Sequence, residues 1–587
     1  MNVLGIHFGH NATVALLTDG RIVFCESEER AARIKNFTGY PRRVLDHIFT
    51  ALAPRADIDL VVLSGSTGLS YAYLRAQKSE HQPMMPFQPH TARGRLHPLY
   101  QVSPWAYHTL RERIRDRRRA PLLDLNGPWL SEARDDFARR LGIGAEKIAF
   151  CDHHDCHVHA TCFNVSPTEP RLIFTIDGEG DGVSATVSQY SAGRLRRLQT
   201  VPTRDSLGYL FAEVTGLLGM KPNEDEFKVM GLAPYSKVSN AERVRDRLAA
   251  LLRLNRDDAF QAAIPMPDVR QHLIDHYSFE RFDHLAAGIQ MLTEDLTAEW
   301  VKRWIARTGI HKISLAGGVF MNVKASQRIA ALPEVEEVYV QPSAGDESNA
   351  IGACFHGYRT LVLDAEFRPV PISDLYLGRE FDDASAEEAL RAGGFDTKFD
   401  VRRPDDLEDA VASLLAVGEV VARCCGRMEW GARALGNRSI LAHPSSRETV
   451  KVINEAIKNR DFWMPFAPSI LDSDMDRYVV NPKGVASPHM TMTFESTPLA
   501  RQHIAAAIHP YDGTLRSQCV TESINPAYHR LIRFFKEKTG IGAVLNTSFN
   551  LHGEPIVCSP ADALRTLDQS GLKHLAVGSY LVSKRDT

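Results

Sequence analysis

Short apolar runs that end in polar or glycine-containing turns recur along the chain, and longer helical stretches separate them. Three of these runs are residues 171–176 before Asp177, residues 313–316 before Gly317 and residues 335–340 before Asp346. Apolar runs bounded by turn residues are typical of buried strands, and strands that alternate with helices build α/β folds. Because ligands of such folds bind beyond the carboxyl ends of the strands, these turns are candidate sites.

The length of 587 residues indicates more than one domain, although no internal repeat stands out in the sequence. The pattern changes between residues 360 and 380, through Arg368-Pro369-Val370-Pro371. We therefore predict one domain over residues 1–365 and a second over residues 366–587.

A histidine-rich stretch, Asp152-His153-His154-Asp155-Cys156-His157, precedes the first of these turns. On a helix, the four-residue spacing of His153 and His157 puts both rings on one face, close enough to share a metal ion. Asp177 and Asp346 are the candidate carboxylate ligands. A hydrogen-bonded polar helix is the alternative. No glutamate follows the first histidine, so the zinc-protease pattern with its general base is not met.

The N-terminus reads as a strand over residues 3–6, a glycine-containing loop with His10, and a hairpin over residues 13–25. Actin-like ATPase domains begin in this way, with backbone N–H groups of the loop near phosphates. His10 is therefore a candidate base or phosphate contact, or else a turn histidine.

Further candidate ligand contacts follow along the chain. Gly317 and Gly318 precede a predicted helix N-terminus, which favours an anion or nucleotide, although a packing turn is the alternative. Lys228 lies in a loop that is either a ligand loop or a charged connector. In the second half, cations and polar donors recur among glycines and suit phosphate groups: Arg433, Arg438, Lys458, Arg460, Arg516, Asn546 and Ser548.

Two charged stretches have a less specific pattern. Residues 26–35 are expected to form a solvated helix face, with cations near an anionic ligand as the alternative. Residues 77–128 are expected to be an insertion over a surface. Its basic run, residues 111–119, indicates a solvated helix or a contact to a substrate.

Composition excludes several classes of protein. A net charge of -3 gives no broad surface for nucleic acid, and nine scattered cysteines fit reduced thiols in the cytoplasm. No run approaches the ~18 apolar residues of a membrane helix, and no signal peptide is recognisable. We expect a cytoplasmic protein without nucleic-acid or membrane partners.

The motifs together resemble the O-carbamoyltransferases of the nodulation-protein, cephalosporin and tobramycin type. The motifs span nearly the whole chain in one order, and as a set they are specific. The motifs include His10-Asn11-Ala12-Thr13, Asp152-His153-His154 with His157, Phe227 to Tyr235, Leu315 to Val319, Gly345-Asp346, Gly426 to Ser439, Lys458 to Pro468 and Leu545 to Asn550.

The resemblance implies an actin-like (ASKHA) N-terminal domain, similar to the tRNA threonylcarbamoyl-transfer protein, and a YrdC-like C-terminal domain. It implies that the second domain forms carbamoyladenylate from carbamoyl phosphate and ATP, with release of pyrophosphate. The carbamoyl group then moves in the first domain to a hydroxyl of a small-molecule acceptor, which leaves AMP.

The resemblance also implies roles for individual residues. The metal ligands would be His153, His157, Asp177 and Asp346, holding Fe(II), although manganese or zinc also suits this set; magnesium would accompany ATP. His10 would be the base. The nucleotide contacts would be Lys228, Gly317, Gly318 and Asn322. The residues around carbamoyl phosphate and the adenylate would be Arg433, Arg438, Lys458, Arg516, Asn546 and Ser548, with Arg433 and Lys458 catalytic.

Competing interpretations remain. An actin-like sugar kinase or ATPase would explain the first half but not the arginine-rich second half, and it predicts ADP as product. A tRNA-modifying enzyme would usually have a basic surface. A binding protein with an inactive site would not need the intact set of histidines and aspartates. The acceptor and the oligomeric state stay open, with a homodimer as one alternative.

Overall fold

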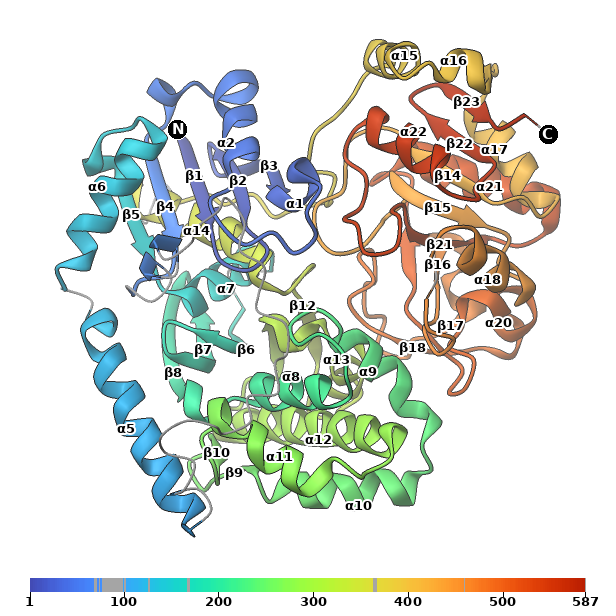
Figure 1. The fold of residues 1–587 in the computed structure, drawn as a ribbon. Coiled ribbons are helices and arrows are strands. Elements are labelled where there is room, and N and C mark those ends of the chain that lie inside the picture. The colour runs from blue at the N-terminus through green and yellow to red at the C-terminus, as the bar shows by residue number, and fades with distance from the viewer. Residues whose placement is uncertain are drawn as a thin grey trace. The chain divides into compact units, whose positions relative to one another are not determined.

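The structure, a computed structural model, describes residues 1–67, 71–72, 74–75, 99, 102–124, 127–165, 169–362, 367–458 and 460–585. The chain divides into two compact units (Figure 1). Unit 1 contains Met1–Val23 and Asn36–Pro371, and unit 2 contains Phe24–Lys35 and Ile372–Thr587. Unit 2 therefore includes a short segment from near the N-terminus.

Among the described residues, unit 1 is built on two five-stranded sheets. The order in the first sheet is β3-β2-β1-β4-β5, and the order in the second is β8-β7-β6-β11-β12. The strands of the first sheet are β1 (Asn2–His7), β2 (Thr13–Thr18), β3 (Arg21–Ser27), β4 (Leu60–Ser64) and β5 (Ile148–Cys151). Those of the second are β6 (Arg171–Gly180), β7 (Val183–Ser191), β8 (Arg194–Pro202), β11 (Lys312–Ala316) and β12 (Glu337–Val340).

The two sheets share one topology. In each, the first strand pairs antiparallel with the second and parallel with the fourth, and the fourth pairs parallel with the fifth. Such a pair of matching sheets is the arrangement of an actin-like domain, so unit 1 has the expected fold. The repeat lies in strand order and not in residue identity, which explains why the sequence shows none.

Two helices lie between the sheets, α7 (His153–Cys162) and α14 (Asn349–Leu361). Helix α14 packs on β1, β2 and β4, α7 packs on β6, β7 and β11, and the two helices pack on each other (Figure 1).

The outer helices and the short hairpin are α2 (Arg42–His47), α5 (Pro104–Leu123), α6 (Trp129–Leu141), α8 (Leu207–Leu217), α9 (Glu226–Leu232), α10 (Val238–Ala249), β9 (Leu252–Leu254), β10 (Phe260–Ala262), α11 (Arg270–Tyr277), α12 (Phe282–Thr308) and α13 (Val323–Ala330).

Unit 2 is also α/β, with an eight-stranded sheet in the described part of the chain, ordered β13-β23-β22-β14-β15-β21-β16-β20. Its strands are β13 (Asp400–Arg402), β14 (Val421–Cys424), β15 (Arg438–Ala442), β16 (Ala467–Leu471), β20 (Gln518–Val520), β21 (Ala543–Ser548), β22 (His574–Val577) and β23 (Tyr580–Ser583). A smaller sheet contains β17 (Val479–Val480), β18 (Phe494–Ser496) and β19 (Thr514–Leu515). The helices are α1 (Glu28–Ala32), α15 (Asp383–Ala392), α16 (Phe395–Lys398), α17 (Leu407–Ala416), α18 (Glu448–Ile453), α19 (Met475–Tyr478), α20 (Pro498–His503), α21 (Pro526–Thr539) and α22 (Pro560–Asp568).

The prediction of a solvated helix face for residues 26–35 is wrong. Glu28 is fully buried and Arg30 is 3% exposed. Arg30 donates a hydrogen bond to the backbone oxygen of Gly431, and Arg33 donates one to the backbone oxygen of Ile556. The charges of this segment are therefore used for contacts inside unit 2.

Much of the predicted insertion, including residues 76–98, lies outside the described residues. The basic run of residues 111–119 is helical, within α5, and is mostly exposed, as predicted. Arg115 pairs with Asp268, and Arg119 pairs with Glu179, all within unit 1. None of the helices searched in the described residues has the length and apolar character to span a membrane.

Candidate metal centre and cation cluster

Helix α7 orients the two histidines that the sequence singled out. Asp152 caps the helix by accepting a hydrogen bond from the backbone N–H of Asp155 at 2.9 Å. The ring centroids of His153 and His157 are 5.0 Å apart, and both side chains are buried. His154 faces elsewhere, because its ring is within hydrogen-bond distance of Thr175 and of the backbone oxygen of Val183. The helical spacing prediction is therefore confirmed for His153 and His157.

The two carboxylates come to these rings from different elements. Asp177 lies where the pairing of β6 with β7 becomes irregular, and β6 continues past it to Gly180 instead of ending at Ile176 as expected. Its Oδ2 is 3.1 Å from Nε2 of His157 and 3.7 Å from Nε2 of His153. Asp346 Oδ1 is 3.5 Å from Nε2 of His153. One ligand atom from each of these four residues lies within 4.8 Å of the others.

The histidine–aspartate cluster places two buried carboxylates beside ionisable imidazoles. Burial and the neighbouring Asp177 raise the pKa of Asp346 well above its ordinary value. Burial opposes ionisation of Asp177 too, but hydrogen bonds from His153 and His157 hold its pKa well below its ordinary value. Burial lowers the pKa of His153, yet the Asp346 and Asp177 carboxylates raise it to about 10. Two buried carboxylates side by side repel each other unless a proton or a cation is shared between them.

The surrounding hydrogen bonds fit this assignment of ligand atoms. His157 Nδ1 is 3.1 Å from Ser348 Oγ, and His153 Nδ1 is 3.3 Å from Asn349 Nδ2. For His157, Nε2 is thus directed to Asp177 while Nδ1 contacts Ser348, as in metal-ligating histidines. For His153, the Asn349 amide lies beside the ring, 3.3 Å from Nδ1 and 3.4 Å from Nε2. Two imidazoles with two carboxylates suit Fe(II), Mn(II) or Zn(II).

His7, which the sequence reasoning did not single out, also faces the cluster. Its Nε2 is 3.6 Å from Asp346 Oδ2 and donates to the backbone oxygen of His10 at 3.0 Å. Burial and the nearby His153 lower the pKa of His7 to about 3, so the ring is neutral. His7 is the last residue of β1, so its position at a strand end is the signal that could have identified it.

The predicted nucleotide contacts of unit 1 have close protein neighbours. Gly318 N donates to Asp177 Oδ2 at 3.1 Å, and Gly317, with φ +92°, has no room for a Cβ atom against Ile176. Asn322 caps α13 by accepting from the backbone N–H of Ala325. Lys228 pairs with Asp225 at 3.2 Å. These contacts give each residue a structural task beside any ligand role.

In unit 2, Arg433, Lys458, Arg460 and Arg516 are linked by electrostatic interactions between neighbouring charges, and we call them the cation cluster. Burial lowers the pKa of Arg516 well below its ordinary value, and the neighbouring charges of Arg433 and Arg460 lower it further. Burial and Arg433 lower the pKa of Arg460 to about 10. Burial, Arg460 and Lys35 lower the pKa of Lys458 well below its ordinary value. Since the charged neighbours that shift these groups are themselves cations, the cluster favours a polyanion.

Of the other predicted residues of unit 2, Ser548 contacts a cation of this cluster, whereas Asn546 and Arg438 have other partners. Lys458 Nζ donates to Ser548 Oγ at 3.0 Å and to Asn550 Oδ1 at 2.7 Å. Asn546 is buried, and its amide donates to Ser469 Oγ at 3.0 Å. Arg438 is 1% exposed and donates to the backbone oxygens of Cys425, Gly426, Asn437 and Cys558. Arg438 therefore holds loops together.

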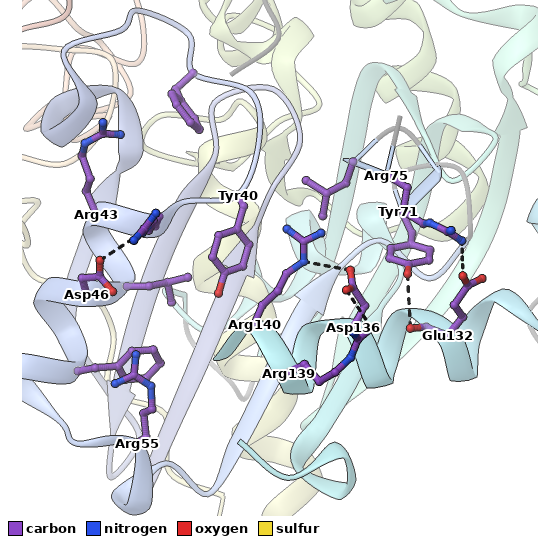
Figure 2. A pocket seen from close by; sticks show the side chains of 15 residues that line it. Tyr40, Arg43, Asp46, Arg55, Tyr71, Arg75, Glu132, Asp136, Arg139 and Arg140 are labelled. Carbon is purple, nitrogen blue, oxygen red and sulfur yellow. Dashed lines mark hydrogen bonds and ion pairs between the residues drawn. The ribbon is translucent and has the colours of Figure 1, made fainter. Parts of the chain in front are cut away.

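A separate cavity of about 660 Å³ in unit 1 has an arginine-rich wall (Figure 2). Several of its arginines are paired: Arg140 lies 3.0 Å and Arg139 lies 3.3 Å from Asp136, and Arg75 pairs with Glu132. None of the histidine–aspartate cluster lines it.

Comparison with known proteins gives matches over both units. The carbamoyltransferase N-terminus family matches residues 2–355, and the carbamoyltransferase C-terminus family matches residues 412–584. Nodulation protein NolNO of Sinorhizobium fredii is 31% identical over 98% of this chain and 79% of its own. A protein of Methanocaldococcus jannaschii is 30% identical over 99% of both chains. The 3'-hydroxymethylcephem-O-carbamoyltransferase of Streptomyces clavuligerus is 27% identical over 65% of this chain and 71% of its own. The chain therefore belongs to the carbamoyltransferase family and is an enzyme that transfers carbamoyl groups.

Proposed function

We propose that the protein is an ATP-dependent O-carbamoyltransferase that works in two steps, one in each unit. Unit 2, in the role of a YrdC-like domain, makes carbamoyladenylate from carbamoyl phosphate and ATP. Unit 1 transfers the carbamoyl group to a hydroxyl of a small molecule and releases AMP. The relative named as a cephem O-carbamoyltransferase supports a small-molecule hydroxyl as acceptor.

The balance of atoms fixes the first step. Carbamoyladenylate contains one phosphorus, from the α position of ATP, so the phosphorus of carbamoyl phosphate must leave as orthophosphate. Water therefore cleaves carbamoyl phosphate to carbamate. A carbamate oxygen then attacks the α-phosphorus of ATP, and pyrophosphate leaves with the electrons of the broken P–O bond.

The cation cluster supplies what this step needs. Carbamoyl phosphate and ATP are both polyanions, and their approach is opposed by charge repulsion. Lys458, Arg460 and Arg516 are basic groups in a partly dehydrated setting that lowers their pKa values. A bound phosphate group would favour their charged forms, and the attraction would be stronger there than in water. Lys458 is fixed by Ser548 and Asn550 before any ligand arrives.

In unit 1, the acceptor hydroxyl attacks the carbonyl carbon of carbamoyladenylate, and the bond from that carbon to the phosphate oxygen breaks to release AMP. His153, His157, Asp177 and Asp346 would hold the divalent ion, which supplies Lewis-acid polarisation of an oxygen. His10 is the proposed base that accepts the hydroxyl proton. His7 orients this loop through its hydrogen bond to the backbone of His10.

One observation carries the proposal: the cation cluster and the histidine–aspartate cluster belong to different compact units. An actin-like kinase needs a single nucleotide site and gives no task to Lys458 and Arg516. Two separate clusters fit an activation step and a transfer step.

The test is to identify the nucleotide products formed from carbamoyl phosphate and ATP. Activation through carbamoyladenylate gives pyrophosphate, and it gives AMP when a hydroxyl acceptor is added. A kinase-type reaction gives ADP. ADP as the main product would overturn the proposal, and an acceptor screen by mass spectrometry for one added carbamoyl group would identify the substrate class.

A further inference from the structure

A second group of metal-ligand types lies on the other side of helix α7. Cys151 is the last residue of β5, His159 lies on α7, and His356 lies on α14. His159 follows His157 by two residues, so its side chain points about 200° around the helix from that of His157. This Cys–His–His group is therefore separate from the histidine–aspartate cluster.

The three side chains are near enough to share one ion. One ligand atom of each residue lies within 4.8 Å of the others. His159 Nε2 and His356 Nδ1 are 3.3 Å apart. Two nitrogens bound to one tetrahedral zinc ion are separated by about 3.3 Å, and nitrogen and sulfur by about 3.6 Å.

The ligand types favour a softer metal than the first cluster does. A thiolate with two imidazoles selects Zn(II) over the harder ions that two carboxylates accept. Cys151 and His159 are buried, with 2% and 8% exposure. A hydrogen bond between the two imidazoles is the competing explanation of their distance.

The group has a path to solvent and room for a fourth ligand. A cavity of about 450 Å³ is lined by His159 and His356, while Cys151 is not part of its wall. Asp155 also lines this cavity and pairs with Arg197 at 2.6 Å. An ion held by the three side chains would therefore keep one position open to this cavity, for water or for the Asp155 carboxylate. Three protein ligands with an open position are the pattern of catalytic zinc sites.

We propose that Cys151, His159 and His356 form a second divalent-metal site, selective for zinc, that opens into the cavity beside Asp155. This site is independent of the proposed carbamoyl chemistry, because it shares no ligand with the histidine–aspartate cluster.

Cobalt(II) is the probe that separates the two sites. A thiolate bound to Co(II) gives an intense ligand-to-metal charge-transfer band in the near ultraviolet, and only the Cys–His–His group has a thiolate. The full-length protein, stripped with a chelator and titrated with Co(II), should show this band. Cys151→Ser should abolish the band. His356→Ala should weaken binding at this site by more than ~100-fold, since even outer-shell losses cost ~10–100-fold.

The controls test both the site and the fold. His153→Ala should keep the band, and so should Cys156→Ser, which removes the thiol that neighbours Cys151. Co(II) binding without the band in Cys151→Ser, together with an unchanged circular dichroism spectrum, would show that this variant is folded. The proposal is overturned if the wild-type protein gives no thiolate band, or if the band survives both Cys151→Ser and His356→Ala.

Discussion

The Asp177 carboxylate lies directly against the backbone of Gly318. Gly318 N donates to Asp177 Oδ2 at 3.1 Å, and a Cβ atom at position 318 would lie 2.9 Å from Asp177 Oδ1. The glycine therefore keeps the carboxylate in line with His157, whose Nε2 is 3.1 Å from the same Oδ2. The Gly317-Gly318 turn, expected to face a nucleotide, supports a candidate metal ligand.

Gly318→Ala should weaken divalent-metal binding by ~10–100-fold, because the added methyl group displaces the carboxylate from the histidines. Metal content after dialysis against defined free Fe(II) or Mn(II) is the measurement. Gly178→Ala is the matched control, since a Cβ at that position meets nothing within 4 Å. Equal metal affinity in the two variants would contradict this role of Gly318.

Lys458→Met should slow pyrophosphate release by ~10²–10³-fold, because a positioned charge is lost at a phosphoryl centre while the buried volume is kept. The melting temperature should fall modestly, since Ser548 and Asn550 lose the donor that Lys458 supplies, so the rate is measured where the variant is folded. Lys451→Met, at an exposed lysine of α18, is the control. An unchanged rate would mean that Lys458 has a structural role only.

Arg438→Met should lower the free energy of unfolding by ~3 kcal/mol or more, because several buried backbone oxygens lose a charged donor. Denaturant unfolding, with Arg533→Met on the exposed face of α21 as control, measures this loss. If Arg438 instead binds the adenylate, as the family resemblance implies, the KM for ATP would rise at unchanged stability.

The ends of predicted strands were the most useful sequence feature for locating candidate site residues. Asp177 and Asp346 were found because each follows an apolar run, and His153 and His157 because their spacing is helical. His7 was missed, although it ends β1, because a single histidine in a short strand has no pattern of its own.

Burial of charged residues was the main failure. Glu28 and Arg30 were predicted to face solvent, yet both are buried, and Arg30 donates a hydrogen bond to Gly431, 401 residues away in the chain. Local pattern carries no information about such contacts. The matching topology of the two sheets in unit 1 was not predicted for a similar reason, because the order in which strands pair is fixed by tertiary contacts and not by residue identity.

The most direct test of the two-site account assays both half-reactions on His153→Ala/His157→Ala, with metal content measured on the same preparation. The control is His272→Ala/His276→Ala, which changes a stacked pair with the same spacing on α11. The account predicts that the first variant loses its divalent metal and carbamoyl transfer to the acceptor but still releases pyrophosphate from ATP and carbamoyl phosphate. Retained metal and transfer, or loss of pyrophosphate release in the folded variant, would contradict it.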